Sequence, residues 1–271
     1  MRMGFAGRAA NPVRVSYASD LHLECEDSLT LDGLEQTDVL VLAGDVSNTA
    51  AAYAGVLHRL RSVYAGPILF VLGNHEYDFG DFPGDLQAYK AAVSHDPLAF
   101  VLEKESVILC GIRFLVVTLW TDFDRGRALE KCRGEMPDFS RTRGLTPEIE
   151  WQTHRETAQW LSEQFASPVS LPTIVVSHHA PSYASRSWKY RRSSISGAFY
   201  SDLDAHIKTW KPYAWIHGHV HHRVHTRVGR TRLLANPWGY PNHHNQRTYS
   251  SLLVHPSVAE RLWNRLVGPV A

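Results

Sequence analysis

The fold is decided by one stretch of the sequence, residues 39–76, which reads VLVLAGDVSNTAAAYAGVLHRLRSVYAGPILFVLGNHE. Its two apolar runs, Val39–Ala43 and Ile68–Leu72, are short enough to be strands buried on both faces. A strand, helix, strand order with polar residues just past each strand is typical of an α/β sheet whose site lies at the carboxyl edge. Each run here ends at a glycine followed by polar side chains, as Gly44-Asp45 and as Gly73-Asn74-His75-Glu76.

The segment between the two runs predicts a helix. One of Ser47, Asn48 and Thr49 can cap its start, and Gly66-Pro67 ends it. The apolar residues at helical spacing are Tyr53, Val56, Leu57, Leu60, Val63 and Tyr64.

The same pattern extends in both directions along the chain. Upstream, Val13–Ala18 predicts a strand that leads to Asp20. Downstream, a hairpin at residues 107–119 implies a mixed sheet, and a long helix starts at Thr146 as cap with Pro147 in first position. Further strands are expected at Thr173–Val176 and Tyr213–Ile216, with a helix near Asp202–Trp210 between them and a hairpin of Val224–Val228 and Thr231–Ala235 after them. Two stretches, Asp122–Gly144 and Ser182–Gly197, are expected to be loops over one face.

Composition narrows the function classes. In 271 residues, 28 Lys and Arg against 27 Asp and Glu leave a net charge of +1, so no global field attracts nucleic acid or an anionic membrane. Three cysteines without a CxxC pair indicate neither a disulfide framework nor a thiolate zinc site. No stretch has the apolar length of a signal peptide or a membrane span. We therefore expect one soluble, cytoplasmic domain over residues 1–271, with residues 1–12 as an N-terminal extension.

Ligand-type side chains follow the expected strands in five separate segments. Singly, each is ordinary turn chemistry, because Asp after a strand and Gly-Asp pairs are common at caps and turns. Together they are specific, since a sheet brings the ends of its strands to one edge, and the chain is rich in histidine with 16 residues. The segments are Asp20-x-His22, Gly44-Asp45, Gly73-Asn74-His75-Glu76, Ser177-His178-His179 and Gly218-His219-Val220-His221.

This ordered set resembles the calcineurin-like metallophosphoesterases, from about Val13 to His221. Leu119–Phe123 and Asn236-Pro237 also look like one bacterial branch of that family. The resemblance implies a metallophosphoesterase-type αββα sandwich, in which two mixed β-sheets are flanked by helices. It also implies a dinuclear metal centre, because two ions about 3.5–4 Å apart can neutralise a phosphoester and bind the attacking oxygen.

The resemblance implies a role for each candidate ligand. Asp45 would bridge the two ions, which the mixed nitrogen and oxygen ligands suggest to be Mn, Fe or Zn. Spacing alone leaves His178 and His179 open, since neighbours on a strand point in opposite directions, and the family block selects His178. One ion would be completed by Asp20, His22 and His221, and the other by Asn74, His178 and His219.

His75 is the candidate catalytic residue. In the family the corresponding histidine contacts the scissile phosphate and aids the leaving group, while Asn74 beside it binds metal. A residue that only orients its neighbours is the alternative. Asp122 could likewise orient a ligand or make a simple loop contact.

The expected substrate is a small-molecule phosphodiester or phosphomonoester such as a nucleotide. The stretch Ser182–Gly197 follows the ligand block at His178, and its Arg186, Trp188 and Arg191 could bind phosphate oxygens and a flat group. A solvated basic loop is the alternative reading. A nuclease, a protein phosphatase or a non-catalytic metal-binding scaffold are the other functions considered, and the oligomeric state is left open.

Overall fold

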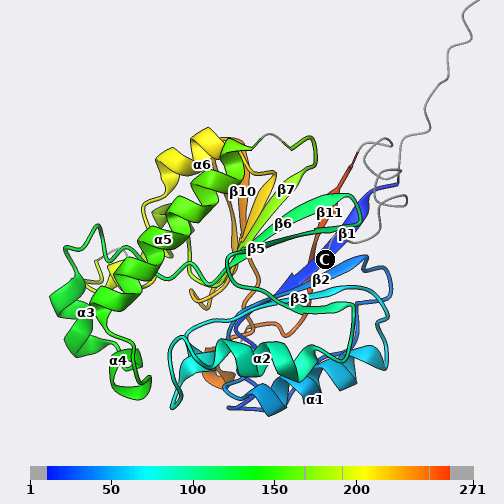
Figure 1. Cartoon of the computed structure of the whole chain (residues 1–271), viewed down its shortest axis with the longest axis horizontal. Helices are drawn as coiled ribbons and strands as arrows, with labels where there is room; N and C mark the ends of the chain where they lie inside the picture. Colours follow the sequence, from blue (N-terminus) through cyan, green and yellow to red (C-terminus); the bar gives the residue numbers. More distant parts are fainter. Residues whose placement is uncertain (1–10, 168, 191, 244, 257–271) are drawn as a thin grey trace, which may run out of the picture.

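A computed structural model of the chain describes residues 11–167, 169–190, 192–243 and 245–256. These residues form two mixed β-sheets packed face to face, with helices on both outer faces (Figure 1). This architecture confirms the expected αββα sandwich. Within the described residues, no helix combines the length and the apolar character that crossing a bilayer requires.

The first sheet has five strands in the order β11-β1-β2-β3-β4. Strands β1 to β4 run parallel, and β11 pairs antiparallel with β1. Helices α1 (Ala50–Arg61) and α2 (Leu86–Val93) lie over its outer face (Figure 1). The strands are β1 (Val13–Ala18), β2 (Val39–Ala43), β3 (Ile68–Val71), β4 (Ala99–Val101) and β11 (Ser250–Val254).

The second sheet has six strands in the order β5-β6-β7-β8-β10-β9. Its central strands β6, β7, β8 and β10 run parallel, and β5 and β9 pair antiparallel at the edges. Helices α5 (Pro147–Ala166) and α6 (Asp204–Trp210) lie on the outer side. The strands are β5 (Glu105–Leu109), β6 (Ile112–Val117), β7 (Thr173–Ser177), β8 (Ala214–His217), β9 (Val224–Val228) and β10 (Thr231–Ala235).

The central strands are apolar at nearly every position because each sheet is covered on both faces. In β2, Val41 points into the core between the sheets, whereas Leu40 and Leu42 pack under α1 and α2. In β7, Val176 faces that same central core and Val175 packs under α5 and α6. Because successive side chains on a strand point to opposite faces, the strands contribute to three apolar layers: one between the sheets and one under the helices on each outer face.

The predicted helix signals are confirmed at two N-termini. Thr49 accepts a hydrogen bond from the N–H of Ala52 at 3.2 Å at the start of α1. Thr146 accepts one from the N–H of Ile149 at 3.3 Å, with Pro147 as the first residue of α5.

The loop predicted over Asp122–Gly144 is wrong in part. It contains two short helices, α3 (Leu129–Glu135) and α4 (Asp138–Arg141), and Cys132 of α3 is buried in a small apolar cluster with Phe123 and Ala198. Tertiary packing therefore orders a stretch whose sequence is dominated by charge. The other predicted loop carries three short 3-10 turns at Tyr183–Ser185, Trp188–Tyr190 and Ser196–Ala198; two more lie at His75–Tyr77 and Pro241–His243.

Candidate metal centre

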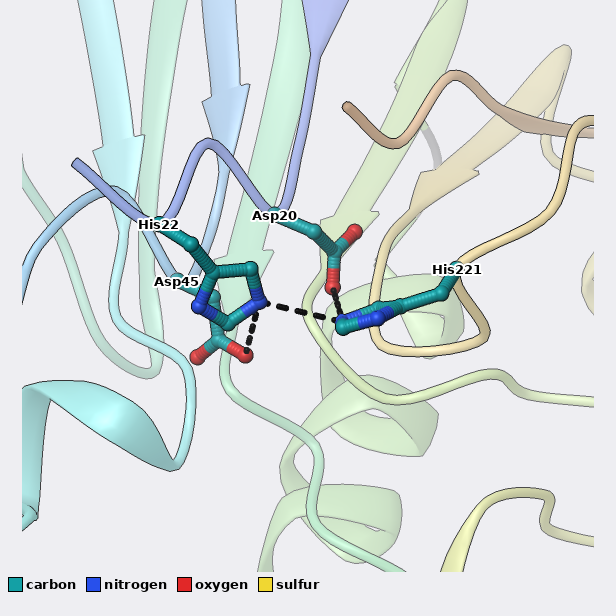
Figure 2. A group of neighbouring side chains, drawn as sticks. All are labelled: Asp20, His22, Asp45 and His221. Atoms are coloured by element: carbon teal, nitrogen blue, oxygen red, sulfur yellow. Dashed lines mark hydrogen bonds and ion pairs between the residues drawn. The ribbon is translucent and has the colours of Figure 1, made fainter. Parts of the chain in front are cut away.

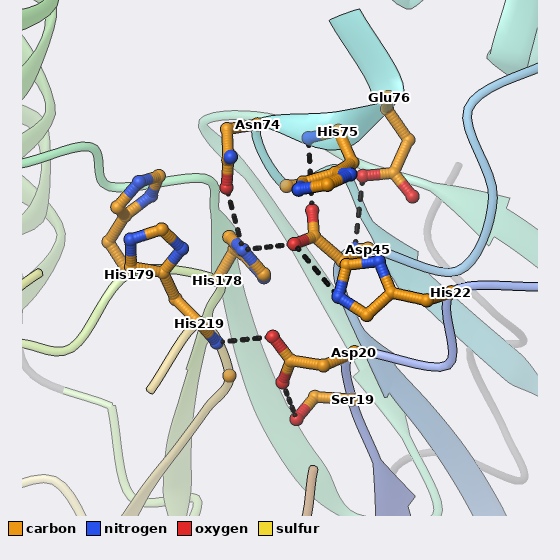
Figure 3. A network of polar contacts seen from close by, with 12 residues as sticks. Ser19, Asp20, His22, Asp45, Asn74, His75, Glu76, His178, His179 and His219 are labelled. Atoms are coloured by element: carbon orange, nitrogen blue, oxygen red, sulfur yellow. Dashed lines mark hydrogen bonds and ion pairs between the residues drawn. The ribbon is translucent and has the colours of Figure 1, made fainter. Parts of the chain in front are cut away.

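The candidate ligands meet where strands of both sheets end. Asp20, Asp45 and Asn74 follow β1, β2 and β3 of the first sheet, and His178 and His219 follow β7 and β8 of the second (Figure 3). Since all five strands are parallel within their sheets and end at the same edge, the sandwich brings together segments about 200 residues apart.

One group of side chains consists of Asp20, His22, Asp45 and His221 (Figure 2). His221 Nε2 lies 3.2 Å from Asp20 Oδ1 and 3.0 Å from His22 Nε2. His22 Nε2 lies 3.7 Å from Asp45 Oδ2. One nitrogen or oxygen of each residue therefore faces a common point.

A second group consists of Asp45, His178 and His219, with Asn74 beside it. His178 Nε2 lies 3.3 Å from Asp45 Oδ2 and 3.2 Å from Asn74 Oδ1. Asp45 belongs to both groups, and its Oδ2 faces His22 on one side and His178 on the other (Figure 3). The two groups therefore share one carboxylate, and each could hold a cation.

The hydrogen bonds of the imidazoles suit a cation. Nδ1 of His178 faces the carbonyl oxygen of Ala43 at 2.9 Å, and Nδ1 of His22 faces the Glu24 carboxylate at 2.9 Å. Each acceptor requires the proton on Nδ1, so in the neutral imidazole Nε2 presents a lone pair to the centre. Second hydrogen bonds of this kind fix metal-ligating histidines in other proteins.

The pKa shifts of His178 and Asp45 also indicate that positive charge is favoured at this site. Burial alone would lower the pKa of His178, but the Asp45 carboxylate next to it raises that pKa to about 9. The pKa of Asp45 lies well below its usual range, because the imidazoles of His178, His75 and His22 outweigh the effect of its burial. The Asp45 carboxylate thus favours a positive charge between these groups.

Several residues at the site have a backbone φ angle in the left-handed region. Left-handed φ values are uncommon in residues other than glycine and cluster at functional sites. Here they recur in the segments that follow three strands, β1, β2 and β8, where the side chains lie close to one another. The values are φ 52° at Asp20, 46° at His22, 52° at Asp45, 67° at His219 and 47° at His221.

Gly73 is required by the close approach of two ligands. A Cβ atom at this position would lie 2.1 Å from Asp45 Oδ1 and 2.7 Å from His178 Nε2. Any side chain here would displace the carboxylate that the two groups share.

Two carboxylates whose roles the sequence did not reveal hold these loops. Glu76 is buried and accepts hydrogen bonds from the N–H groups of Gly73 at 2.6 Å, Asp45 at 3.0 Å and Val46 at 2.7 Å. Asp138 Oδ1 accepts from Asn74 Nδ2 at 2.7 Å, which turns Oδ1 of Asn74 toward His178. Glu76 lies within the predicted block Gly73-Asn74-His75-Glu76, although no role was assigned to it, whereas no local pattern marks Asp138.

His75 lies at the rim of the centre. Its Nε2 is 3.0 Å from the Tyr240 hydroxyl, and its Nδ1 is 3.5 Å from Glu24 Oε1. Burial lowers the pKa of His75, but the Asp45 and Glu24 carboxylates raise it to about 10. Its own N–H donates to Asp45 Oδ1 at 3.1 Å, so the backbone of His75 is tied to the shared aspartate.

Glu24 connects His22 and His75, and these three side chains form a third group that could hold a cation. Burial raises its pKa, but the hydrogen bonds from both imidazoles lower it to about 2. Its Oε2 is buried and has no hydrogen-bond partner among the described residues. The sequence carried a weak signal for it, because Glu24 lies two residues after His22 and extends the alternation of Asp20 and His22.

Other polar residues near the ligand blocks pack against or hydrogen-bond to neighbouring segments. The ring of His179 packs against Trp120 and His219, with centroids 5.2 and 4.2 Å away, and His179 belongs to neither group of side chains. His217 Nε2 bonds Ser185 Oγ at 2.9 Å. The Asp122 carboxylate accepts from the N–H groups of Asp124 and Asp202, both at 2.9 Å, which is a loop contact.

A cavity of about 410 Å³ opens beside the centre, and His75, His219 and His221 line it. The stretch Ser182–Gly197 contributes Tyr190, Ser193, Ile195 and Ser196 to its wall. Trp188 is 74% exposed, and Arg186 lies over the ring of Tyr183; neither is among the residues that line the cavity. Arg191 lies outside the described residues, so a role of these three in substrate binding stays a prediction.

The fold and the site define a class of protein: a two-sheet α/β sandwich with groups of imidazole and carboxylate side chains after its parallel strands, two of which share Asp45. Residues 13–223 match the family described as calcineurin-like phosphoesterase. The chain therefore belongs to the calcineurin-like phosphoesterase family, as its resemblance implied.

Solved structures share the fold at low identity. Phosphopantetheinyl hydrolase (PptH) from Mycobacterium tuberculosis is 16% identical, with 93% of this chain and 98% of that chain covered and a TM-score of 0.64. TT1561 of Thermus thermophilus is 13% identical, with 89% and 99% covered and a TM-score of 0.53. GAP50, described as the anchor in the inner membrane complex of Plasmodium, is 12% identical, with 92% and 78% covered and a TM-score of 0.50. No curated protein sequence matches the chain.

Proposed function

We propose that this chain hydrolyses a small phosphoester with the help of two metal ions. The observation that carries the proposal is the Asp45 carboxylate, whose Oδ2 lies 3.3 Å from His178 Nε2 and 3.7 Å from His22 Nε2. One buried oxygen shared between two groups of lone pairs is the arrangement expected of a dinuclear site. We also propose that the whole chain acts as one domain.

The residues would divide between the two ions as the family resemblance implies. Asp20, His22 and His221 would hold one, Asn74, His178 and His219 the other, and Asp45 both. When bound, Mn, Fe or Zn ions would neutralise the phosphate oxygens and activate the attacking water. Every candidate side chain offers an oxygen or a neutral imidazole nitrogen, so the donor set fits these metals.

His75 would supply the proton that the leaving group needs. It lines the cavity, and its Nε2 lies 3.0 Å from the Tyr240 hydroxyl. As the P–O bond breaks, a proton from Nε2 would pass to the departing alkoxide oxygen. Tyr240 and Glu24 contact the ring at its two nitrogens, and the leaving oxygen would have to approach Nε2 from the cavity that His75 and Tyr240 both line.

Removal of metal tests the proposal directly. We expect protein stripped with dipicolinate to lose hydrolysis of p-nitrophenyl phosphate or of bis(p-nitrophenyl) phosphate. Added Mn, Fe or Zn should restore it, with close to two ions bound per chain by plasma mass spectrometry. Full turnover by metal-free protein would rule the mechanism out, and metal binding without turnover of either ester would favour a non-catalytic metal-binding scaffold.

Glu24→Gln should weaken the site without abolishing it. The carboxylate orients His22 at 2.9 Å and faces His75 at 3.5 Å, and outer partners of this kind are typically worth about 10- to 100-fold in metal affinity or activity. We expect the loss in kcat to be larger for an alkyl ester than for a p-nitrophenyl ester, because only a poor leaving group needs the proton from His75. A variant with equal losses on both esters and normal metal affinity would show that Glu24 does not act through His75. Glu26→Gln, on the exposed surface, is the matched control.

A further inference from the structure

The cavity beside the metal centre has one apolar wall. Met136 and Pro137 come from the junction of α3 and α4, and Ile195 and Phe199 come from the segment after the Trp188–Tyr190 turn. Met136, Ile195 and Phe199 pack against the small cluster formed by Phe123, Cys132 and Ala198. The apolar side chains of this wall are thus held in place by contacts with a buried core.

This wall begins at a candidate metal ligand. The ring of Phe199 stacks on His219, with centroids 4.9 Å apart and planes 27° from parallel. Val220, which follows His219, lines the cavity as well. A phosphoryl group held at the centre would therefore place one of its ester groups against apolar side chains.

The charges at the cavity are negative where they are not imidazoles. Glu135 and Asp138 line it together with Asp45. Glu135 forms an ion pair with Lys131 at 2.6 Å, and Asp138 bonds Asn74. Among the described residues that line the cavity, none is Lys or Arg, so the part of the wall that the structure describes offers no such cation to a second phosphate.

We propose that the cavity selects phosphoesters that carry an uncharged, apolar alkyl or aryl group, which inserts against Met136, Ile195 and Phe199. The inference rests on the proposed function, because it assumes that the phosphoryl group binds at the two groups of ligands. A volume of about 410 Å³ falls in the range of small-molecule sites, roughly 300–1,000 Å³, and leaves room for such a group. Buried apolar surface contributes about fourfold in affinity per methylene.

Alkylphosphonates test the inference, because their C–P bond resists hydrolysis. With the phosphonate at the metal centre, their single chain is expected to extend along the apolar wall. We would measure inhibition of metal-loaded protein by methyl-, butyl- and hexylphosphonate, with 3,4-dihydroxybutylphosphonate as the polar match. The inhibition constant should fall by at least about tenfold from methyl to butyl. The dihydroxybutyl compound should bind no more tightly than the methyl compound, since its hydroxyl groups lose water against an apolar wall.

Variants locate the effect. Ile195→Ala and Met136→Ala should each reduce the ratio of the methyl to the butyl inhibition constant by about three- to tenfold. Ile149→Ala, on the exposed side of α5, should change neither constant. An inhibition constant that is independent of chain length, or tighter binding of the dihydroxybutyl compound, would overturn the inference. Loss of metal-dependent hydrolysis altogether would instead overturn the proposed function, so the two failures can be told apart.

Discussion

Asp45→Ala should lose metal and hydrolysis together. The Asp45 carboxylate is 1% exposed and lies between His22 and His178, so its removal leaves each group of ligands without its shared anion. Transition-state stabilisation by metal ions is worth several kcal/mol, and about 1.4 kcal/mol is a factor of ten in rate. We expect kcat/KM to fall by at least about 1,000-fold, with fewer than two ions bound per chain by plasma mass spectrometry.

Two further variants show whether the effect of Asp45→Ala comes from the lost charge and whether it is specific to this position. Asp45→Asn keeps an oxygen that can accept the N–H of His75, which now bonds Asp45 Oδ1 at 3.1 Å, but it removes the charge. It should also lose metal, which would separate the charge from the packing. Asp32→Ala, at an exposed position, should bind and turn over normally. An Asp45→Ala protein that folds and retains two ions would show that Asp45 does not bridge them.

His75→Ala should keep its metal and lose catalysis. Removal of a general acid typically costs about 100- to 10,000-fold, and His75 belongs to neither of the two groups of side chains that share Asp45. The deficit should be concentrated in kcat and should be greatest for alkyl esters, whose alkoxides need a proton. Turnover of alkyl and p-nitrophenyl esters, compared at equal metal content, measures it.

A matched variant separates catalysis from structure. His58 is exposed on α1, outside the ligand blocks, and His58→Ala should behave as the original protein. Metal loss in His75→Ala would assign the residue to coordination through Glu24 and His22. Unchanged turnover of every ester would remove it from the mechanism.

The sequence predicted much of the frame because the relevant signals are local. Val39–Ala43 is apolar at each position, since both faces of β2 are covered, and β2 has these bounds in the structure. Thr146 and Pro147 marked the start of α5 through cap chemistry that acts within one turn. Weaker elements escaped notice: β4 and α2 are short, and β11 is an edge strand with Leu253 exposed.

The convergence of the candidate ligands could be predicted for the same reason. Each candidate lies in a segment that follows a strand, and parallel strands bring their ends to one edge whatever the loops between them do. The left-handed backbone at Asp20, Asp45 and His219 was not visible in the sequence, because nothing local requires it at residues other than glycine. The fold imposes that conformation, and tertiary packing puts the adjacent residues His178 and His179 to different uses.

The sequence by itself determined the family, the strands that end at the site and the candidate ligands. Only the tertiary structure decided how those ligands are supported, because contacts between distant segments leave no periodic pattern. Asp138 accepts a hydrogen bond from Asn74, 64 residues away in the sequence, and the Tyr240 hydroxyl contacts His75, 165 residues away. Ile195 lines the cavity from a loop that was expected to contribute cations. The shape and the polarity of a cavity depend on which side chains converge in space, and that is set by packing rather than by order along the chain.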